Sequence, residues 1–194
     1  MRALKISLAV LLATPFMSLS APVLCRNGAG AVQLHVSGKP FLVVGGELHN
    51  SSSSGVEYFA RALDDAASTG VNTVLAPVSW QQFERTEGQY DFALVDALLR
   101  EVRVRKLKWV VLWFGAWKNG ESSYAPGWVK RDTRRFARVR NDRGEELETL
   151  DPCSKELLKV ECRTFAALMR HLAAVAGGDV LPDDAWRVSA VHFL

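Results

Sequence analysis

Residues 71–77 read VNTVLAP, a short β-rich run that ends at Pro77. A comparable run, KWVVLWFG, occupies residues 108–115, and FLVVGG at residues 41–46 is ended by two glycines. Short, continuous apolar runs of this kind are typical of strands that are buried on both faces. The sequence therefore predicts three buried strands, which begin near residues 41, 71 and 108.

A helix is predicted after each strand. The first ends at Gly70, the second opens at Tyr90-Asp91-Phe92, and the third begins at Asp151-Pro152 and ends at Gly177-Gly178. Glycine commonly follows a helix and proline fits its first turn, so these residues mark the boundaries. Apolar residues recur at helical spacing in each segment: Phe59, Ala62, Leu63, Ala66 and Ala67, then Phe92, Val95, Leu98, Leu99 and Val102, then Leu157, Leu158, Phe165, Leu168, Met169 and Leu172.

The strands and helices alternate, and the strand starts are about 30 and 37 residues apart. Such alternation indicates parallel strands joined by right-handed crossovers. No P-loop or GxSxG motif occurs, and GAGAVQ at residues 28–33 lacks the third glycine of a dinucleotide-binding loop. The pattern predicts an α/β fold, namely the N-terminal part, about three to four βα units, of a (β/α)8 TIM barrel. A hairpin or lead-in strand is expected within residues 21–38.

The chain has 194 residues, of which 48% are hydrophobic and 23% are charged, so a folded protein is expected. A complete barrel needs about 250 residues. The sequence thus predicts a truncated barrel. The net charge of +3 comes from 24 basic and 21 acidic residues and gives no argument for a nucleic-acid or membrane-surface partner.

Residues 1–20 have the composition of a signal peptide. Arg2 and Lys5 precede a short apolar core, and Ser18 and Ser20 supply small residues before a cut at Ala21. The apolar run is too short to span a bilayer as a mature helix. We expect export to the periplasm or the extracellular space, with an uncleaved anchor as the alternative.

In a parallel sheet of this type, function lies on the loops after the carboxyl ends of the strands. The first such loop contains GGELHN, with Glu47, His49 and Asn50, and the next two loops cover residues 77–92 and 113–128. These last two are rich in tryptophan. Flat aromatic faces beside amides and carboxylates suit a sugar. The alternative is that the tryptophans Trp80, Trp113, Trp117 and Trp128 pack the loops, as Trp109 is expected to pack the core.

Carboxylates are present in these loops but form no evident pair. Glu47 is the best candidate for contacting a substrate, because it stands at a strand end. Glu84 is expected to cap or salt-link its loop, Asp91 to cap the helix that follows it, and Glu121 to be solvated. His49 is compatible both with a hydrogen-bonded structural role and with a place in a cleft.

The segment W-x-x-F-E-x-x-x-G-x-Y-D-F at residues 80–92 resembles the segment after the second strand in clan A glycoside hydrolases. Together, GGELHN, NTVLAPVSWQQFE and VVLWFGAWKNGESSYAPGWVKRD are similar to β-galactosidases of glycoside hydrolase families 35 and 42. The resemblance covers residues 32–176. The chain departs from it at Arg85-Thr86, where the families often have proline, and at Ala116, where many family 35 members have a glutamate that contacts galactose.

The resemblance implies retaining hydrolysis of terminal β-galactosides by two glutamates, with an oligosaccharide or polysaccharide as partner and without metal or cofactor. It places the acid/base in an Asn-Glu pair after strand four and the nucleophile after strand seven. The chain contains no Asn-Glu dipeptide. We therefore expect an inactive truncation without catalytic residues. The alternatives are a non-catalytic carbohydrate-binding module and a non-functional fragment. By resemblance, the sugar site would be lined by Glu47, His49, Asn50, Trp80, Trp113, Trp117 and Tyr124.

The remaining features carry weaker expectations. Residues 21–178 are predicted to form the partial barrel domain and residues 179–194 a divergent tail from a truncated or shifted reading frame, although Val188–Leu194 is weakly strand-like. The basic stretch Lys130–Arg143 is compatible with a solvated loop or with attraction of an anionic polysaccharide. Cys153 and Cys162 are expected to be buried thiols, with a disulfide between them as the alternative.

Overall fold

The computed structural model describes residues 22–177 and 188–193. The predicted signal peptide at residues 1–20 and most of the predicted tail at residues 179–194 lie outside the described residues. The part of the tail that is described forms a strand, β9 (Val188–Phe193), so the weak strand signal there is confirmed.

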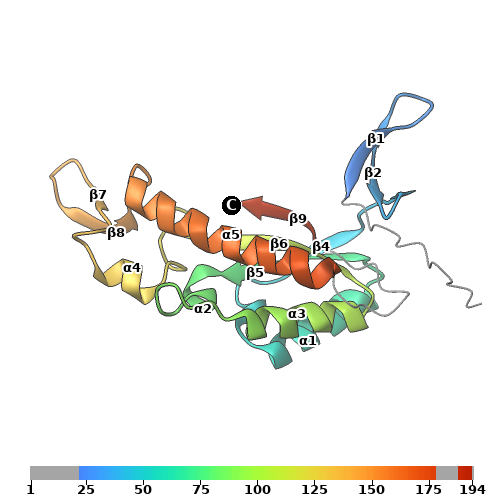
Figure 1. Ribbon diagram of the computed structural model, residues 1–194, viewed down its shortest axis with the longest axis horizontal. Helices are drawn as coiled ribbons and strands as arrows, with labels where there is room; N and C mark the ends of the chain where they lie inside the picture. The colour runs from blue at the N-terminus through green and yellow to red at the C-terminus, as the bar shows by residue number, and fades with distance from the viewer. Residues whose placement is uncertain (1–21, 178–187, 194) are drawn as a thin grey trace, which may run out of the picture.

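The main sheet has the order β4-β5-β6-β9, and every neighbouring pair in it is parallel. Its other strands are β4 (Gly45–Glu47), β5 (Thr73–Ser79) and β6 (Lys108–Phe114). The helices between them are α1 (Val56–Ser68), α3 (Phe92–Val104) and α5 (Lys155–Gly177), preceded locally by the short helices η1 (Ser52–Ser54) and α2 (Trp80–Phe83). This alternation confirms the predicted α/β architecture with a parallel sheet (Figure 1).

The register of the sheet decides which side chains share a face. Glu47 is opposite Leu75, and Leu75 is opposite Val110. Successive side chains of a strand point to opposite faces, so this row lies on one face and the residues next to it lie on the other. The strand residues of the hydrophobic core all belong to that second face: Val74, Ala76, Val78, Trp109, Val111 and Trp113. The helices therefore cover the second face, which we call the helix face, and the row of Glu47 lies on what we call the inner face.

Local signals place the helices where the sequence predicts them. Asp91 caps α3 by accepting a hydrogen bond from the Leu94 amide at 3.0 Å, as predicted. Gly70, with φ of +83°, follows α1 and permits the turn into β5. Arg103 of α3 donates to the carbonyl of Val175 in α5, which fixes these two helices side by side (Figure 1).

The first strand differs from its prediction. Residues 41–46 were expected to form a strand buried on both faces, but β4 covers only Gly45–Glu47, and Leu42 is 79% exposed. Val43 and Val44 are exposed as well. Within the described residues β4 pairs only with β5, so the residues that precede it have no second strand to cover them.

Two antiparallel hairpins extend beyond the main sheet (Figure 1). The predicted N-terminal hairpin is confirmed as β1 (Val23–Arg26) and β2 (Val32–Val36). The short β3 (Lys39–Pro40) follows β2 and pairs with it as a third strand. The chain between β6 and α5 contains α4 (Gly127–Arg131) and the hairpin of β7 (Arg138–Arg140) with β8 (Glu146–Leu150). The side chain of Asn141 accepts from two backbone amides and Gly144 adopts φ of +81°, which closes this turn.

Candidate functional site

The inner face carries one carboxylate near its carboxyl edge. Among the side chains that β4, β5 and β6 direct to this face, Glu47 is the only acidic one, and it is exposed. His49 lies two residues beyond the end of β4 and is also exposed. The structure thus places the two predicted residues at the edge where the fold binds ligands.

A small recess of about 70 Å³, which we call the Asn50 recess, lies at the carboxyl end of β5. Asn50 and Tyr124, both predicted site residues, lie in its wall although they are far apart in sequence. The complete lining is Asn50, Ser51, Ser53, Ser54, Pro77, Ser79, Gln81, Gln82 and Tyr124. Polar side chains dominate this wall, which therefore offers hydrogen-bond donors and acceptors to a hydroxylated ligand.

Three loops are tied together around this recess. The backbone N–H of Gln81 donates to the backbone carbonyl of Tyr124 at 2.9 Å, and the Ser53 hydroxyl donates to the carbonyl of Pro77. The ring centroids of Tyr124 and Phe114 are 4.8 Å apart, which holds the tyrosine against the end of β6. The wall is consequently built by backbone and aromatic contacts rather than by a free loop.

The surroundings of His49 are compatible both with a structural role and with a place in a ligand site. Its Nδ1 accepts a long, 3.4 Å hydrogen bond from the Ser51 amide, while the ring remains exposed. The contact leaves the other ring nitrogen as the donor. A ligand at this exposed edge of the sheet could therefore receive a hydrogen bond from it.

The predicted tryptophans do not join this site. Trp80 and Trp113 are buried in the hydrophobic core, and Trp113 lies on the helix face because of its place in β6. The indole of Trp80 donates to Glu84, that of Trp113 to Glu161 and that of half-buried Trp117 to the carbonyl of Leu150. For Trp80 and Trp113 the structure supports packing, so the expected aromatic lining of the sugar site is corrected at these two positions. Trp109 is buried in the core as predicted.

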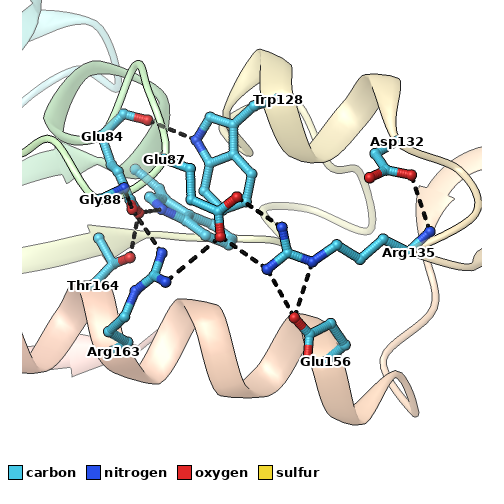
Figure 2. Close-up of polar contacts among 10 residues, drawn as sticks. Glu84, Glu87, Gly88, Trp128, Asp132, Arg135, Glu156, Arg163 and Thr164 are labelled. Carbon is cyan, nitrogen blue, oxygen red and sulfur yellow. Dashed lines mark hydrogen bonds and ion pairs between the residues drawn. The ribbon is translucent and has the colours of Figure 1, made fainter.

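Glu84 organises the loop after β5. It is fully buried and accepts hydrogen bonds from the Trp80 indole at 2.7 Å, the Gly88 amide at 2.7 Å, Arg163 at 2.9 Å and the Thr164 hydroxyl (Figure 2). A buried carboxylate needs such partners to offset its lost hydration. The prediction that Glu84 links its loop is confirmed, and the link reaches α5.

Arg135 connects the loop after β5 to α5 through two ion pairs. Figure 2 shows its guanidinium between Glu87, at 2.7 Å, and Glu156, at 2.8 Å. The hydrogen bonds from Arg135 hold the pKa of Glu87 below its usual value. Elsewhere in the basic stretch, Arg138 donates to two backbone carbonyls and Arg140 pairs with Glu146. These three arginines thus serve internal contacts.

The helix face contains a feature that the sequence analysis did not predict. A cavity of about 300 Å³, which we call the Glu161 pocket, is lined by Trp113, Gly115, Trp117, Leu158, Glu161, Cys162 and Phe165. Glu161 stands in the apolar stripe of α5, between Leu158 and Phe165 at helical spacing, and that position was the available sequence signal. Cys162 is exposed, as is Cys153, and neither forms a disulfide, so the prediction that these thiols are buried is wrong.

No group of three or more potential metal ligands is found in the part of the chain that the structure describes. Likewise, no helix among the described residues is long and apolar enough to span a bilayer.

Comparisons with known proteins show what the chain is similar to. The model of glycosyl hydrolases family 35 matches residues 33–171. No curated protein sequence matches the chain. An exo-β-1,4-mannosidase from Opitutaceae bacterium strain TAV5 has a similar structure, with a TM-score of 0.51 and 23% identity over 79% of this chain. The catalytic domain of a β-amylase from Paenibacillus polymyxa gives a TM-score of 0.51 and 20% identity over 69% of this chain.

These two structural likenesses concern the fold, which is that of (β/α)8-barrel glycosidases. The chain spans 25% of the length of the first structure and 33% of the second.

Proposed function

Because the chain belongs to family 35 of the glycosyl hydrolases, we propose that the carboxyl edge of its sheet forms part of the sugar site of a β-galactosidase-like enzyme. The substrate is an oligosaccharide or polysaccharide with β-linked galactose. The observation that carries the proposal is the position of Glu47 on the inner face, at the carboxyl end of β4. In a barrel, this edge is where ligands bind.

Each proposed contact has a chemical role. The carboxylate of Glu47 accepts hydrogen bonds from sugar hydroxyls, and charge-assisted bonds of this type are strong and directional. Asn50 offers both a donor and an acceptor, while the ring of Tyr124 presents a flat surface to the C–H face of a sugar. His49 contributes a donor from the nitrogen that Ser51 does not occupy.

We assign neither catalytic glutamate to the residues that the structure describes. Retaining glycosidases use two carboxyl groups about 5–5.5 Å apart, one as acid/base and one as nucleophile. Of β4, β5 and β6, only β4 directs a carboxylate to the inner face, so Glu47 serves as a substrate contact. The proposal therefore assigns binding of a galactoside, without turnover, to the chain by itself.

The leader composition of residues 1–20 supports a further part of the proposal, namely export to the periplasm or the extracellular space. N-terminal sequencing of protein recovered from the exported fraction tests it. A mature N-terminus at Ala21 is the expected result, and intact protein retained with the cytosol would contradict export.

Ligand-observed NMR with methyl β-galactoside tests the sugar site. We expect weak, millimolar binding by the full chain and about tenfold weaker binding by Glu47→Gln, because one charge-assisted hydrogen bond is lost. The control is Glu145→Gln, an exposed glutamate in the turn of the β7–β8 hairpin. Equal affinity of Glu47→Gln and the unmodified chain would overturn the assignment of Glu47. Equal binding of methyl β-mannoside would overturn the preference for galactose.

An activity assay tests the assignment of the catalytic groups. We expect no hydrolysis of 4-nitrophenyl β-galactoside by the purified chain. Measurable turnover that is abolished in Glu47→Gln would show instead that Glu47 is catalytic.

A further inference from the structure

The Glu161 pocket lies on the helix face, between the end of β6 and α5, and so on the opposite side of the sheet from Glu47. Its volume of about 300 Å³ is within the range of small-molecule sites. Three aromatic side chains and one carboxylate contribute to its wall, and the rest of the lining is Gly115, Leu158 and Cys162. The pocket therefore has a single charged group in apolar surroundings.

The carboxylate of Glu161 is held firmly. Its Oε1 accepts hydrogen bonds from the Trp113 indole at 3.0 Å and from the Ala116 amide at 3.1 Å. Gly115 allows this approach, because a Cβ atom at that position would lie 1.7 Å from the same oxygen. The sequence at the end of β6 is thus fitted to a carboxylate that comes from α5.

Among the described residues, no cation is paired with this carboxylate. None of the ion pairs among the described residues involves Glu161, and both of its hydrogen bonds within residues 22–177 go to Oε1. Burial raises the pKa of Glu161, and its two N–H donors oppose that change. A partly buried carboxylate of this kind gains from a cation that enters the pocket and bonds to the remaining oxygen.

We propose that the Glu161 pocket binds a small organic cation, a protonated amine on an apolar or aromatic body. The ammonium group bonds to Glu161, and the rings of Trp113, Trp117 and Phe165 contact the apolar body. Aromatic faces attract cations, and they do so more strongly where water is excluded. A sugar fits this wall less well, because only one polar side chain faces its several hydroxyls.

Titration with 2-phenylethylamine tests the proposal, with 2-phenylethanol as the neutral probe of similar shape. Trp113 and Trp117 line the pocket, so their fluorescence reports occupancy. At neutral pH we expect the amine to bind at least tenfold more tightly than the alcohol. We expect at least a tenfold loss of amine affinity in Glu161→Gln, which keeps the acceptor for Trp113, and no change in the control Glu57→Gln on α1.

A second variant covers the case in which Glu161→Gln does not fold. Leu158 is exposed at the wall of the pocket, and Leu158→Trp fills space while Glu161 remains. It should weaken amine binding and leave methyl β-galactoside binding unchanged. Equal affinities for amine and alcohol, no binding of the amine by the unmodified chain, or unaltered binding by the folded variants would overturn the proposal.

Discussion

Arg163 on α5 donates a 2.9 Å hydrogen bond to the buried carboxylate of Glu84, which lies 79 residues earlier in the chain. This contact joins the loop after β5 to the third main helix. Since Trp80 and Gly88 bond to the same carboxylate, the loop and the helix depend on one another (Figure 2).

Replacing Glu84 should therefore destabilise the whole fold. In Glu84→Gln, the amide brings a donor to a place where all four partners are donors, and Arg163 loses the nearer of its two charge partners, while Glu87 at 3.5 Å remains. We expect the free energy of unfolding to fall by about 2–4 kcal/mol, measured by urea denaturation. The control Glu57→Gln breaks only an exposed pair with Arg61 and should cost less than about 0.5 kcal/mol. Equal free energies of unfolding for these two variants would contradict the stabilising role of Glu84.

Arg135 should set part of the response to acid. Its hydrogen bonds lower the folded pKa of Glu87, so the stabilisation is present above the ordinary glutamate pKa of 4.5 and is lost as the pH falls through the lower, folded value. In Arg135→Leu this contribution is absent. We expect the variant to be less stable at neutral pH and to lose less further stability below pH 4.5. Thermal unfolding of both proteins, measured from neutral to acidic pH, tests this. If the melting temperatures of the variant and the unmodified chain fell in parallel with pH, Arg135 would not contribute to the acid response.

Gly115 should not tolerate a side chain. In Gly115→Ala the new Cβ would lie 1.7 Å from Glu161 Oε1 and 2.6 Å from Trp113 Nε1, so these groups must move. Overpacking of this kind costs about 1–3 kcal/mol. Gly28→Ala is the matched control, because nothing lies within 4 Å of its Cβ position. A double variant with Glu161→Ala removes the opposing oxygen and should recover part of the loss in urea denaturation; no recovery would locate the strain elsewhere.

Glu161 should make the fold less stable as the pH rises. Burial raises the pKa of Glu161 in the folded chain above the ordinary value of 4.5. Between pH 4.5 and this higher folded pKa, the folded chain binds more protons than the unfolded chain. The free energy of unfolding therefore decreases as the pH rises through this range. In Glu161→Gln the decline is removed. Urea denaturation from pH 4.5 to neutral pH measures it. A decline of the same size in both proteins would assign the effect to another group.

The sequence predicted the elements well because their signals are local. The apolar runs at residues 71–77 and 108–115 became β5 and β6, and Asp91 caps α3 as its position indicated. The family resemblance over residues 32–176 agrees with the matched range of 33–171.

The faces of the strands were harder to predict. A run such as KWVVLWFG is apolar on both sides, so alternation tells that Trp109 and Trp113 share a face but not which face the helices cover. The family resemblance places Trp113 in the sugar site, whereas in the structure it packs against Phe165 of α5. The position of the Glu161 carboxylate depends on hydrogen bonds from Trp113 and Ala116, which are 48 and 45 residues away in the chain. No local sequence pattern predicts such a contact.

The position of β4 bears on how the protein behaves at high concentration. In the part of the chain that the structure describes, β4 ends the sheet, and Leu42, Val43 and Val44 are exposed beside it. An open strand edge next to apolar side chains is a template for the addition of another strand. Self-association, and with it turbidity on storage, is therefore expected to begin at this edge, and a lysine in place of Val43 is the substitution that should keep the chain in solution.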